Sequence, residues 1–267
     1  MDNRYQLILA TDCGGTDRGR YEIAAHRCFF PYLVQPVFFE TTSLSTLHCG
    51  FVATAHALST VDHFGPLRIG ENIGLLVNAA PERDDIYALE LDNGVQVVGP
   101  HLGFNFHFLR DRVRKSYLVR DTRDRSGKET PFRSMEIMVP ALAVRLGAAD
   151  FPHLEFVPQE LPRYDPEPGV YVADWDSHDN LYLVSTGEDE SWIPALGETR
   201  VFRIGNTVAR LRHVDGIFAG ETGEQVLTTG SLRLNGKSVH YIVVRGSRAR
   251  AMLGNPTVGT KVLVGDR

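Results

Sequence analysis

The sequence predicts an α/β fold in two parts: an N-terminal Rossmann-like α/β domain and a C-terminal small β-barrel domain. Over residues 1–157, apolar runs typical of buried strands alternate with segments whose apolar residues recur at helical spacing. That alternation indicates a parallel or mixed sheet covered by helices on both faces. From residue 170 the signals are nearly all strand, with turn residues between them, which favours a small barrel or sandwich. A single α+β unit is the alternative interpretation.

The chain's 267 residues are enough for one large domain or two modest ones. Apolar residues make up 43% and charged residues 23%, the usage of an ordinary globular protein. The net charge of −5 disfavours a broad nucleic-acid surface, and no apolar run reaches the ~18 residues of a membrane span. No basic region precedes an apolar stretch at the N-terminus, and the three cysteines lack CxxC spacing. We therefore expect a cytoplasmic protein with free thiols and without nucleic-acid or membrane partners.

In the N-terminal domain, apolar and β-branched runs predict strands, and apolar residues at helical spacing predict helices. The expected strands are 5–11, 34–39, 73–77 and a hairpin of 87–91 and 95–98 around Asp92-Asn93-Gly94. The expected helices are 18–29, 46–59 and 135–146. Ser45 or Thr46 is placed to cap the second of these helices.

A proline-rich segment separates the two predicted domains. Four prolines fall within eleven residues, at Pro158, Pro162, Pro166 and Pro168. Because such spacing is incompatible with a helix, residues 158–169 are predicted to be an extended linker. The β-rich domain then spans 170–267, with strands expected at 170–175, 181–184, 200–204, 208–211, 240–244 and 261–264.

The junction after the first strand, Thr11-Asp12-Cys13-Gly14-Gly15-Thr16-Asp17, is the most informative local feature. In open α/β sheets ligands bind beyond the carboxyl ends of the strands, which is where Asp12 falls. A carboxylate there can accept two hydrogen bonds from a ribose diol, and the glycines let the backbone approach a ligand closely. The alternative is that Asp12 and Asp17 only cap the turn and the next helix. Taken by itself, the local sequence favours capping, since short Gly-rich matches are weak evidence.

A metal site is not predicted. His48, Cys49, His56 and His63 fall within sixteen residues, but His48 and His56 are eight residues apart rather than four. That spacing does not place two ligands on one helical face, so these side chains are expected to be solvated or satisfied by hydrogen bonds.

Several cationic or imidazole side chains admit both a ligand-binding and a structural interpretation. His101 and His107 flank an aromatic loop and either face a ligand or pack at the edge of the core. Arg83 and Arg133 lie in predicted loops, where each either binds a carboxylate or is a surface charge. The run of basic residues from 110 to 115 is expected to form a solvated face. GxSxG, P-loop and GxGxxG motifs are absent, which argues against three common enzyme classes.

Five segments of the chain resemble motifs of one enzyme family. They occur in the same order along the chain, and with similar spacing, as in that family. LILATDCGGTD resembles a strand followed by D-x-G-T-x-D, and GLLVNAAPER stands in the place of a strand followed by D-P-G-V-G-T-x-R. TPFRSMEIMVPALAVRL is similar to F-x-(G/S)-R-(D/E) and the helix after it, and DWDSHDN stands in the place of D-x-F-G-N. VRGSRARAMLGNPTVG resembles the final G-S strand and its loop. These are motifs of the S-adenosyl-L-methionine (SAM) hydroxide adenosyltransferases and their fluorinase and chlorinase relatives.

The resemblance implies a homotrimer in which SAM binds between the N-terminal domain of one subunit and the C-terminal domain of the next. It implies displacement at C5′ of SAM by water or hydroxide, giving adenosine and methionine, or by halide, giving the 5′-halide of adenosine and methionine. SAM is then the substrate, and no further cofactor is needed. One alternative is a catalytically degenerate SAM- or nucleoside-binding protein on the same trimeric scaffold. Another is a different enzyme that kept the scaffold and changed its ligand.

The resemblance also assigns roles to individual residues of both domains. Asp12 would hold the ribose hydroxyls, while Thr16 and Asp17 would shape the loop. Phe132 and Ser134 would lie close to the reacting C5′ carbon. On the C-terminal domain, the residues expected to bind the methionine end or the adenine are Asp176, Asn180, Arg245, Gly246 and Ser247.

The chain departs from the family at the positions that act on the nucleophile. The hydrolase branch uses an Asp, an Arg and a His, and these positions read Asn78, Arg83 and Arg133. Asn78 can orient a water but cannot take its proton at neutral pH. Together with Ser134, these three residues are the candidate catalytic residues, and His101 is the nearest candidate for a replacement base.

The family's other motifs are altered as well. Its G-x-D-N-G loop reads GPHLG over 99–103, and the Phe-Gly of its C-terminal motif reads His178-Asp179. The aromatic residue that fluorinases place over the substrate aligns with Ser45. These changes bear on the chemical step more than on the fold.

Overall fold

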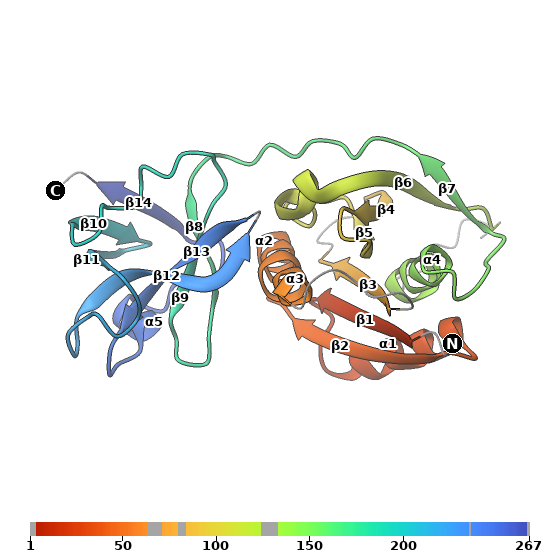
Figure 1. Ribbon diagram of the computed structural model, residues 1–267, viewed down its shortest axis with the longest axis horizontal. Helices are drawn as coiled ribbons and strands as arrows, with labels where there is room; N and C mark the ends of the chain where they lie inside the picture. The colour runs from red at the N-terminus through yellow and green to blue at the C-terminus, as the bar shows by residue number, and fades with distance from the viewer. Residues whose placement is uncertain (1–3, 64–70, 80–83, 124–132, 235, 266–267) are drawn as a thin grey trace. The chain divides into compact units, whose positions relative to one another are not determined.

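The protein is described by a computed structural model that covers residues 4–63, 71–79, 84–123, 133–234 and 236–265 (Figure 1). The chain divides into two compact units, residues 1–164 and 165–267. The boundary between them falls within the proline-rich segment 158–169, of which residues 159–169 contain neither helix nor strand. The mixed α/β character expected from the sequence is confirmed.

The first unit contains a seven-stranded mixed sheet in the order β2-β1-β3-β5-β4-β6-β7. The pairs β1/β2, β1/β3 and β3/β5 are parallel, whereas β4/β5, β4/β6 and β6/β7 are antiparallel. The strands are β1 (Arg4–Thr11), β2 (Leu33–Glu40), β3 (Glu71–Asn78), β4 (Ile86–Leu91), β5 (Gln96–Pro100), β6 (Val113–Asp121) and β7 (Leu154–Pro158). The predicted hairpin is confirmed as β4 and β5.

The order of the parallel strands defines where a ligand site is expected. The chain runs from β1 to β2 on one side and then crosses back to β3 on the other side of β1. Thr11, the last residue of β1, pairs with both Glu40 and Asn78, the last residues of β2 and β3. The connections therefore diverge at the carboxyl ends of β1 and β3, which is the place where open α/β sheets bind their ligands.

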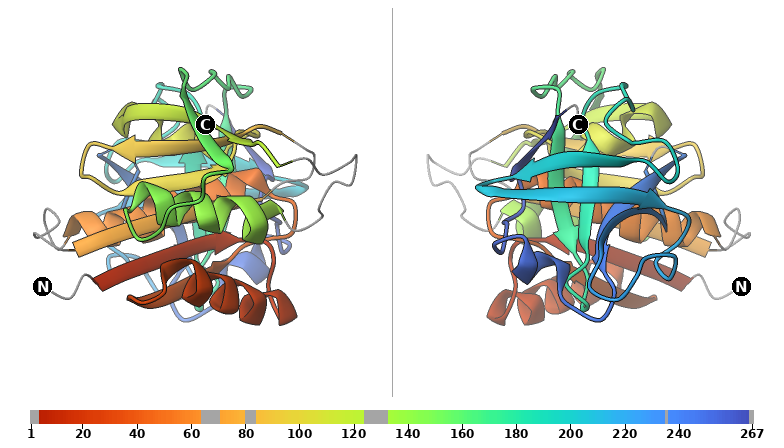
Figure 2. Two further views of the ribbon diagram at one scale, coloured as in Figure 1. Left: turned by 90° about the vertical axis from the view of Figure 1, so that its right-hand side faces the viewer. Right: turned by 90° about the vertical axis from the view of Figure 1, so that its left-hand side faces the viewer.

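Helices pack against this sheet, and two of them contain π-helical turns. The helices are α1 (Thr16–Phe29), α2 (Thr46–Phe51), the π-helix η1 (Val52–Leu58), α3 (Ser59–His63), the 3-10 helix η2 (His107–Arg112), the π-helix η3 (Ser134–Met138) and α4 (Val139–Arg145). The predicted helix 46–59 is thus a continuous run from α2 to α3 in which Ser45 is the N-cap and accepts a hydrogen bond from His48 N. α1 packs against β2, and the left view of Figure 2 shows this helix running alongside β1.

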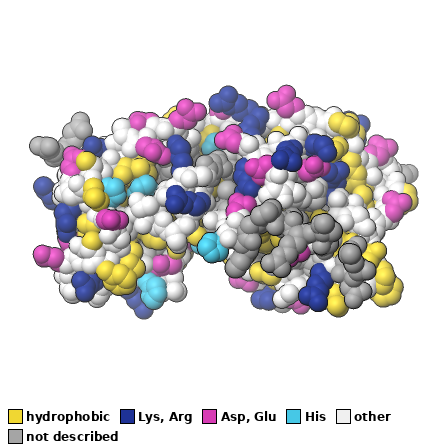
Figure 3. Space-filling view, viewed as in Figure 1, with side chains coloured by type: hydrophobic (Ala, Val, Ile, Leu, Met, Phe, Trp, Pro, Cys, Tyr) yellow, Lys and Arg dark blue, Asp and Glu magenta, His cyan; other side chains and the backbone are white. Residues whose placement is uncertain are grey.

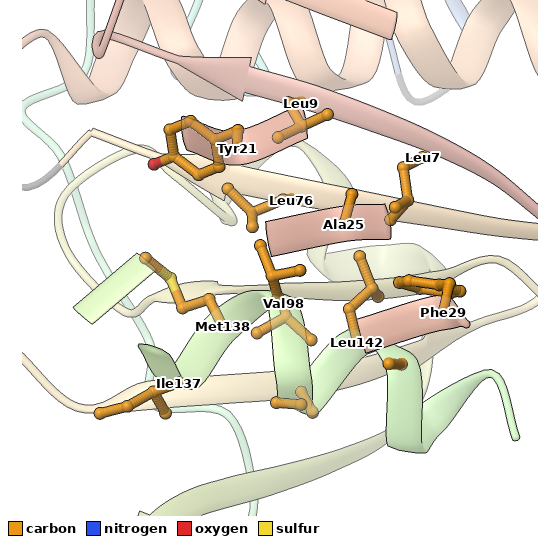
Figure 4. Packing of buried hydrophobic residues seen from close by; sticks show 14 of the residues in the cluster. Leu7, Leu9, Tyr21, Ala25, Phe29, Leu76, Val98, Ile137, Met138 and Leu142 are labelled. Atoms are coloured by element: carbon orange, nitrogen blue, oxygen red, sulfur yellow. The ribbon is translucent and has the colours of Figure 1, made fainter. Parts of the chain in front are cut away.

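The apolar core of the first unit joins one face of the sheet to α1 and α4 (Figure 4). Tyr21, Ala25 and Phe29 recur every four residues on α1 and are almost completely buried, so they form a single apolar stripe. They pack with residues of the parallel strands and with the helical segment from η3 to α4, namely Leu7, Leu9, Leu76, Val98, Ile137, Met138 and Leu142. This packing fixes α1 and η3 relative to the ends of β1 and β3.

The second unit is a seven-stranded closed barrel in the order β10-β11-β12-β13-β9-β8-β14. Its elements are β8 (Val170–Trp175), β9 (Leu181–Ser185), β10 (Thr199–Ile204), β11 (Thr207–Val214), β12 (Gln225–Leu234), β13 (Lys237–Val244), the helix α5 (Ala249–Met252) and β14 (Lys261–Gly265). Pairing of β14 with both β8 and β10 completes the ring. Its core is built from alternate residues of these strands, such as Phe202, Ile204, Leu227 and Ile242.

Some elements and environments differ from the prediction. The strands β6, β7 and β12 and the helices η2 and α5 were not predicted. The expectation that the basic run 110–115 forms a solvated face is wrong for its first members. Arg110 donates to the Leu161 carbonyl at 3.0 Å, and Arg112 forms ion pairs with Asp62 and Asp92 at 2.6 and 2.9 Å. Arg133 is helical rather than in a loop, because it directly precedes η3.

Among the described residues, no helix combines the length and apolarity needed to cross a bilayer. On the face drawn in Figure 3, acidic and basic side chains are interspersed and not segregated into patches of one sign.

Candidate functional site

Asp12 directly follows β1 and lies at the divergence point between β1 and β3. Its backbone N–H donates to the Asn78 carbonyl at 3.2 Å. Its Oδ2 atom accepts a hydrogen bond from the backbone N–H of Leu44 at 2.8 Å, and its Oδ1 atom lies 3.6 Å from Cys13 Sγ. Because an ionised carboxylate offers about four acceptor positions, this half-buried carboxylate keeps capacity for donors from a ligand.

The capping interpretation of Asp12 is not supported by its contacts. The N-cap of α1 is Gly15, which has a positive φ of 62° and no side chain to cap the helix. Asp17 lies in the first turn, where its negative charge suits the helix N-terminus, and it pairs with Arg20 at 3.0 Å. Asp12 instead bonds to a residue 32 positions away. The side chain of Thr16 lies outside the described part of the structure.

Asn78 ends β3 beside Asp12 and is 7% exposed. Its Nδ2 group donates to Tyr21 Oη at 2.9 Å and to Thr11 Oγ1 at 3.3 Å, and lies 3.6 Å from Cys13 Sγ. The amide nitrogen is therefore surrounded by acceptors from β1, from the loop after it and from α1. No described residue donates to Asn78 Oδ1, and this atom is not among the fully buried atoms without a partner. The carbonyl oxygen thus keeps contact with solvent.

Tyr21 contributes its hydroxyl to this group from the apolar side of α1. Its ring packs among apolar residues while its hydroxyl points away from them (Figure 4). Burial raises the pKa of the Tyr21 phenol well above its ordinary value, and hydrogen bonding with Ser134 opposes that shift. The phenol is therefore neutral. Burial and the neighbouring Asp12 charge also raise the pKa of the Cys13 thiol, so Cys13 is a protonated thiol and not an activated nucleophile.

Arg133 and His101 both lie close to Asp84. Arg133 Nη2 donates to the Asp84 carbonyl at 2.6 Å, and His101 Nδ1 lies 3.9 Å from Asp84 Oδ2. The other imidazole nitrogen, Nε2, lies 2.9 Å from the Pro162 carbonyl. Because Ser134 follows Arg133, these contacts extend the polar groups of the edge from Asp12 to His101.

The second unit brings its candidate residues together at one end of the barrel. Asp176 and Asn180 belong to the hairpin turn between β8 and β9, while Arg245, Gly246 and Ser247 form the exposed turn after β13. The antiparallel register places Ile242 of β13 opposite Leu181 of β9, so the two turns lie side by side. Arg250 N, in the helix α5 that follows the second turn, donates to the Asp179 carbonyl of the first turn at 2.9 Å.

The Asp176 carboxylate is largely used within its own turn. Oδ1 accepts from His178 N at 2.8 Å and from Asn180 N at 3.0 Å, and Oδ2 accepts from Asn180 Nδ2 at 2.9 Å. Asx-type bonds of this kind hold a turn in shape. Asp176 therefore shapes the loop that presents Asn180 and the backbone to a ligand. Beside it, the Arg250 guanidinium lies 3.6 Å from the centre of the Trp175 ring.

Two candidate residues, Arg83 and Phe132, lie outside the described residues. Two of the four side chains weighed as metal ligands have other partners. His48 Nδ1 accepts from Thr42 N at 2.8 Å, and Cys49 Sγ contacts the Ala10 carbonyl at 3.2 Å. Within the described part of the chain, no three His, Cys, Asp or Glu side chains form a group able to hold a metal ion.

Tyr21, Leu44 and Asp84 contact the candidate residues described above but were not singled out from the sequence. A tyrosine within an apolar helical stripe carries no signal that its hydroxyl reaches a strand end 57 residues away. Leu44 contributes only its backbone N–H, which no side-chain pattern reveals.

Comparison with known proteins identifies solved structures of similar fold. A crystal structure of an uncharacterized conserved protein from Thermotoga maritima matches with a TM-score of 0.69 and 12% identity, over 98% of this chain and 100% of that one. A conserved hypothetical protein from Thermus thermophilus matches with a TM-score of 0.58 and 19% identity, over 99% and 100% of the chains. This likeness shows the fold alone. No protein-family model matches the sequence, and no curated protein matches it.

Proposed function

We propose that this protein binds SAM and cleaves it by displacement at C5′ with water, releasing adenosine and methionine. The observation that carries the proposal is the Asp12 carboxylate, held by Leu44 N at the point where the connections of β1 and β3 diverge. The proposal treats the first unit as a Rossmann-like nucleoside-binding domain, in which this carboxylate accepts hydrogen bonds from the two ribose hydroxyls.

The chemistry needs alignment more than acid catalysis. The water oxygen forms the new bond to C5′ while the C5′–S bond breaks, and sulfur keeps the electron pair as methionine leaves as a neutral thioether. The oxygen then loses a proton, so one sulfonium charge becomes one proton. Orientation of nucleophile and substrate can contribute about 7–11 kcal/mol to such a step. Asn78 orients the water, and His101, whose Nδ1 lies 3.9 Å from Asp84 Oδ2, takes the proton in this proposal.

The second unit supplies the other half of the proposed site. We place the methionine end and the adenine on the adjacent turns 176–180 and 245–247, presented by the barrel of a neighbouring copy in a homotrimer. Exposed Arg245 and the Asn180 amide are groups that bind carboxylate and ammonium ends. All three cysteines are unpaired, which suits the cytoplasm, where we place the activity.

One observation favours a second candidate, a protein that binds SAM or a nucleoside without turning it over. The Asn78 amide is held by Tyr21 and Thr11, and the neighbouring thiol and phenol both have raised pKa values. None of the side chains in contact with the Asn78 amide group, Thr11, Cys13 and Tyr21, is therefore a base at neutral pH.

Incubation of the full chain with SAM in water enriched in ¹⁸O tests the proposal. Chromatography and mass spectrometry are expected to find adenosine and methionine in equal amounts, with one ¹⁸O atom at the 5′ position of adenosine. An enzyme-free sample measures the spontaneous breakdown of SAM. Adenosine without ¹⁸O would contradict displacement by water at C5′.

Calorimetric titration with SAM and with adenosine separates the remaining cases. Binding without adenosine above the enzyme-free rate would support the second candidate. If neither SAM nor adenosine binds, both candidate functions are wrong. The ligand at the carboxyl ends of β1 and β3 would then be of a different kind.

A further inference from the structure

Given the proposed function, Asn78 is placed to decide which nucleophile the site accepts. Asn78 offers two chemically opposite groups: an amide NH₂ that donates hydrogen bonds and a carbonyl oxygen that accepts them. An NH₂ group facing the nucleophile would suit a halide ion, which only accepts. A carbonyl oxygen would suit water, which donates, and would repel an anion.

The contacts of Asn78 decide which end faces the ligand. Its Nδ2 group faces Tyr21 Oη at 2.9 Å and Thr11 Oγ1 at 3.3 Å. Thr11 is fully buried and already accepts from Cys13 N at 3.0 Å, so its oxygen is fixed in place. With the nitrogen held on that side, Oδ1 is the end that keeps contact with solvent beside Asp12.

Tyr21 is the residue that fixes this orientation most strongly. Its hydroxyl makes the shorter of the two hydrogen bonds to the amide, and its ring is wedged in the apolar core at 0% exposure.

We propose that Tyr21 is a positioning residue that turns the carbonyl oxygen of Asn78 towards the nucleophile, so that the site accepts water and rejects halide ions. Tyr21 acts through Asn78 and touches neither substrate nor the reacting atoms. The orientation of the Asn78 amide thus depends on a core residue of α1, the helix that follows Asp12 in the chain.

Product analysis in halide buffers tests the proposal. SAM is incubated with the protein in sodium chloride, sodium bromide and sodium acetate of equal ionic strength, and adenosine and 5′-halogenated adenosine are separated by chromatography. The wild type is expected to form adenosine alone in all three. Tyr21→Phe is expected to lower kcat for adenosine about tenfold, the effect of one lost hydrogen bond to the nucleophile's partner, with less than about a twofold change in KM. The share of halogenated product is expected to rise.

Tyr5→Phe is the matched control. Tyr5 is 3% exposed in the same core but stands near the start of β1, at the opposite end of the strand from Asp12. It is expected to keep the wild-type product ratio and kcat. Halogenated product from the wild type, or an unchanged kcat in Tyr21→Phe, would overturn the proposal.

A second measurement separates this inference from the proposed function. Hydrogen exchange of the Asn78 side-chain amide, followed by NMR in the ligand-free protein, is expected to be slow in the wild type and faster in Tyr21→Phe. If the wild type forms neither product, the proposed function fails and this exchange decides the positioning role. Equal exchange rates in the two proteins would overturn it.

Discussion

The Asp12 carboxylate and the Leu44 backbone are joined by a 2.8 Å hydrogen bond, and Leu44 adopts a positive φ of 58° to make it. A leucine in this region is strained, at a cost of about 1–2 kcal/mol. The bond ties the loop after β2 to the end of β1 and sets the direction of the carboxylate. Substitutions of Asp12 and of Leu44 therefore test the role of this bond.

Asp12→Ala removes the proposed acceptor of the ribose hydroxyls. We expect nucleoside binding to weaken by about 1.5–3 kcal/mol, the usual value of a hydrogen bond to a charged group, measured by calorimetric titration with SAM and adenosine. The control is Asp150→Ala, which removes an equal charge from an exposed position. Unchanged affinity in Asp12→Ala would contradict the ribose role.

Leu44→Gly relieves the strain of the positive φ and keeps the backbone N–H that Asp12 accepts. Because the side chain is 58% exposed, little burial is lost, and we expect the free energy of unfolding to rise by about 0.5–1 kcal/mol. Chemical denaturation followed by circular dichroism measures it. Leu196→Gly, at a comparably exposed position with an ordinary φ, is expected to be neutral or destabilising. Equal effects of the two substitutions would show that Leu44 is not strained.

The double substitution Asn78→Asp with Arg133→His restores the residues of the resembled hydrolases. A carboxylate at position 78 is a stronger acceptor for water, and an imidazole at position 133 can take a proton, so we expect adenosine formation to rise at least about tenfold. Adenosine is measured by chromatography, and the two single variants are the controls. The alignment of positions 78 and 133 with the family is wrong if the double variant shows no gain.

Asp176→Ala tests the role of this carboxylate in its turn. Three hydrogen bonds to it are lost, and we expect the second unit to lose about 1–3 kcal/mol of unfolding free energy. Both tryptophans of the chain, Trp175 and Trp192, lie in this unit, so tryptophan fluorescence reports its unfolding separately. Asp215→Ala, an exposed position in the same unit, is the control. A stability equal to that of the control would argue against a turn-forming role.

His240 makes the stability of the second unit depend on pH. Burial and repulsion from His213 lower the pKa of His240 from 6.5 to about 4. The attraction of Glu190 opposes this shift only in part. Between these values the unfolded chain binds more protons, so stability is full above pH ~6.5 and falls as the pH drops towards 4. We expect a loss of about 1–2 kcal/mol, because partial exposure weakens the effect.

Fluorescence-monitored denaturation between pH 8 and 4 measures this dependence, since Trp192 lies 5.3 Å from the His240 ring. His240→Gln is expected to flatten the profile between pH ~6.5 and 4. His178→Gln, at an exposed position, is the control and is expected to keep it. A profile unchanged by His240→Gln would assign the pH dependence to other groups.

The elements that could be predicted from the sequence are those whose signals are local. The buried runs of β1, β3 and β8 and the apolar stripe of α1 each show their period within a few residues. The strand β6 was missed because VRKSYLVRD carries charges on its exposed positions. The strand β12 was missed because its middle is polar and contains Gly230, where a Cβ atom would overlap the ring of Tyr241 on β13.

In the candidate site, too, local features could be predicted and features that depend on distant residues could not. The position of Asp12 could be predicted because the strand and the glycines that follow it are adjacent in sequence. The orientation of Asn78 could not, because it depends on Tyr21, whose contact arises only when α1 packs on β3. The turn-forming bonds of Asp176 are local, but whether a carboxylate serves its own turn or a ligand is decided by backbone geometry.

The π-helical η3 has a consequence for how this chain is compared with its structural neighbours. A π turn holds one residue more than an α turn, and this one begins at Ser134 and leads into Val139, the start of α4. A neighbour with an ordinary α-helix in this place would need one residue fewer to reach the same buried face. Aligning the two without a gap would shift Ser134 by one position and assign its role to the wrong side chain.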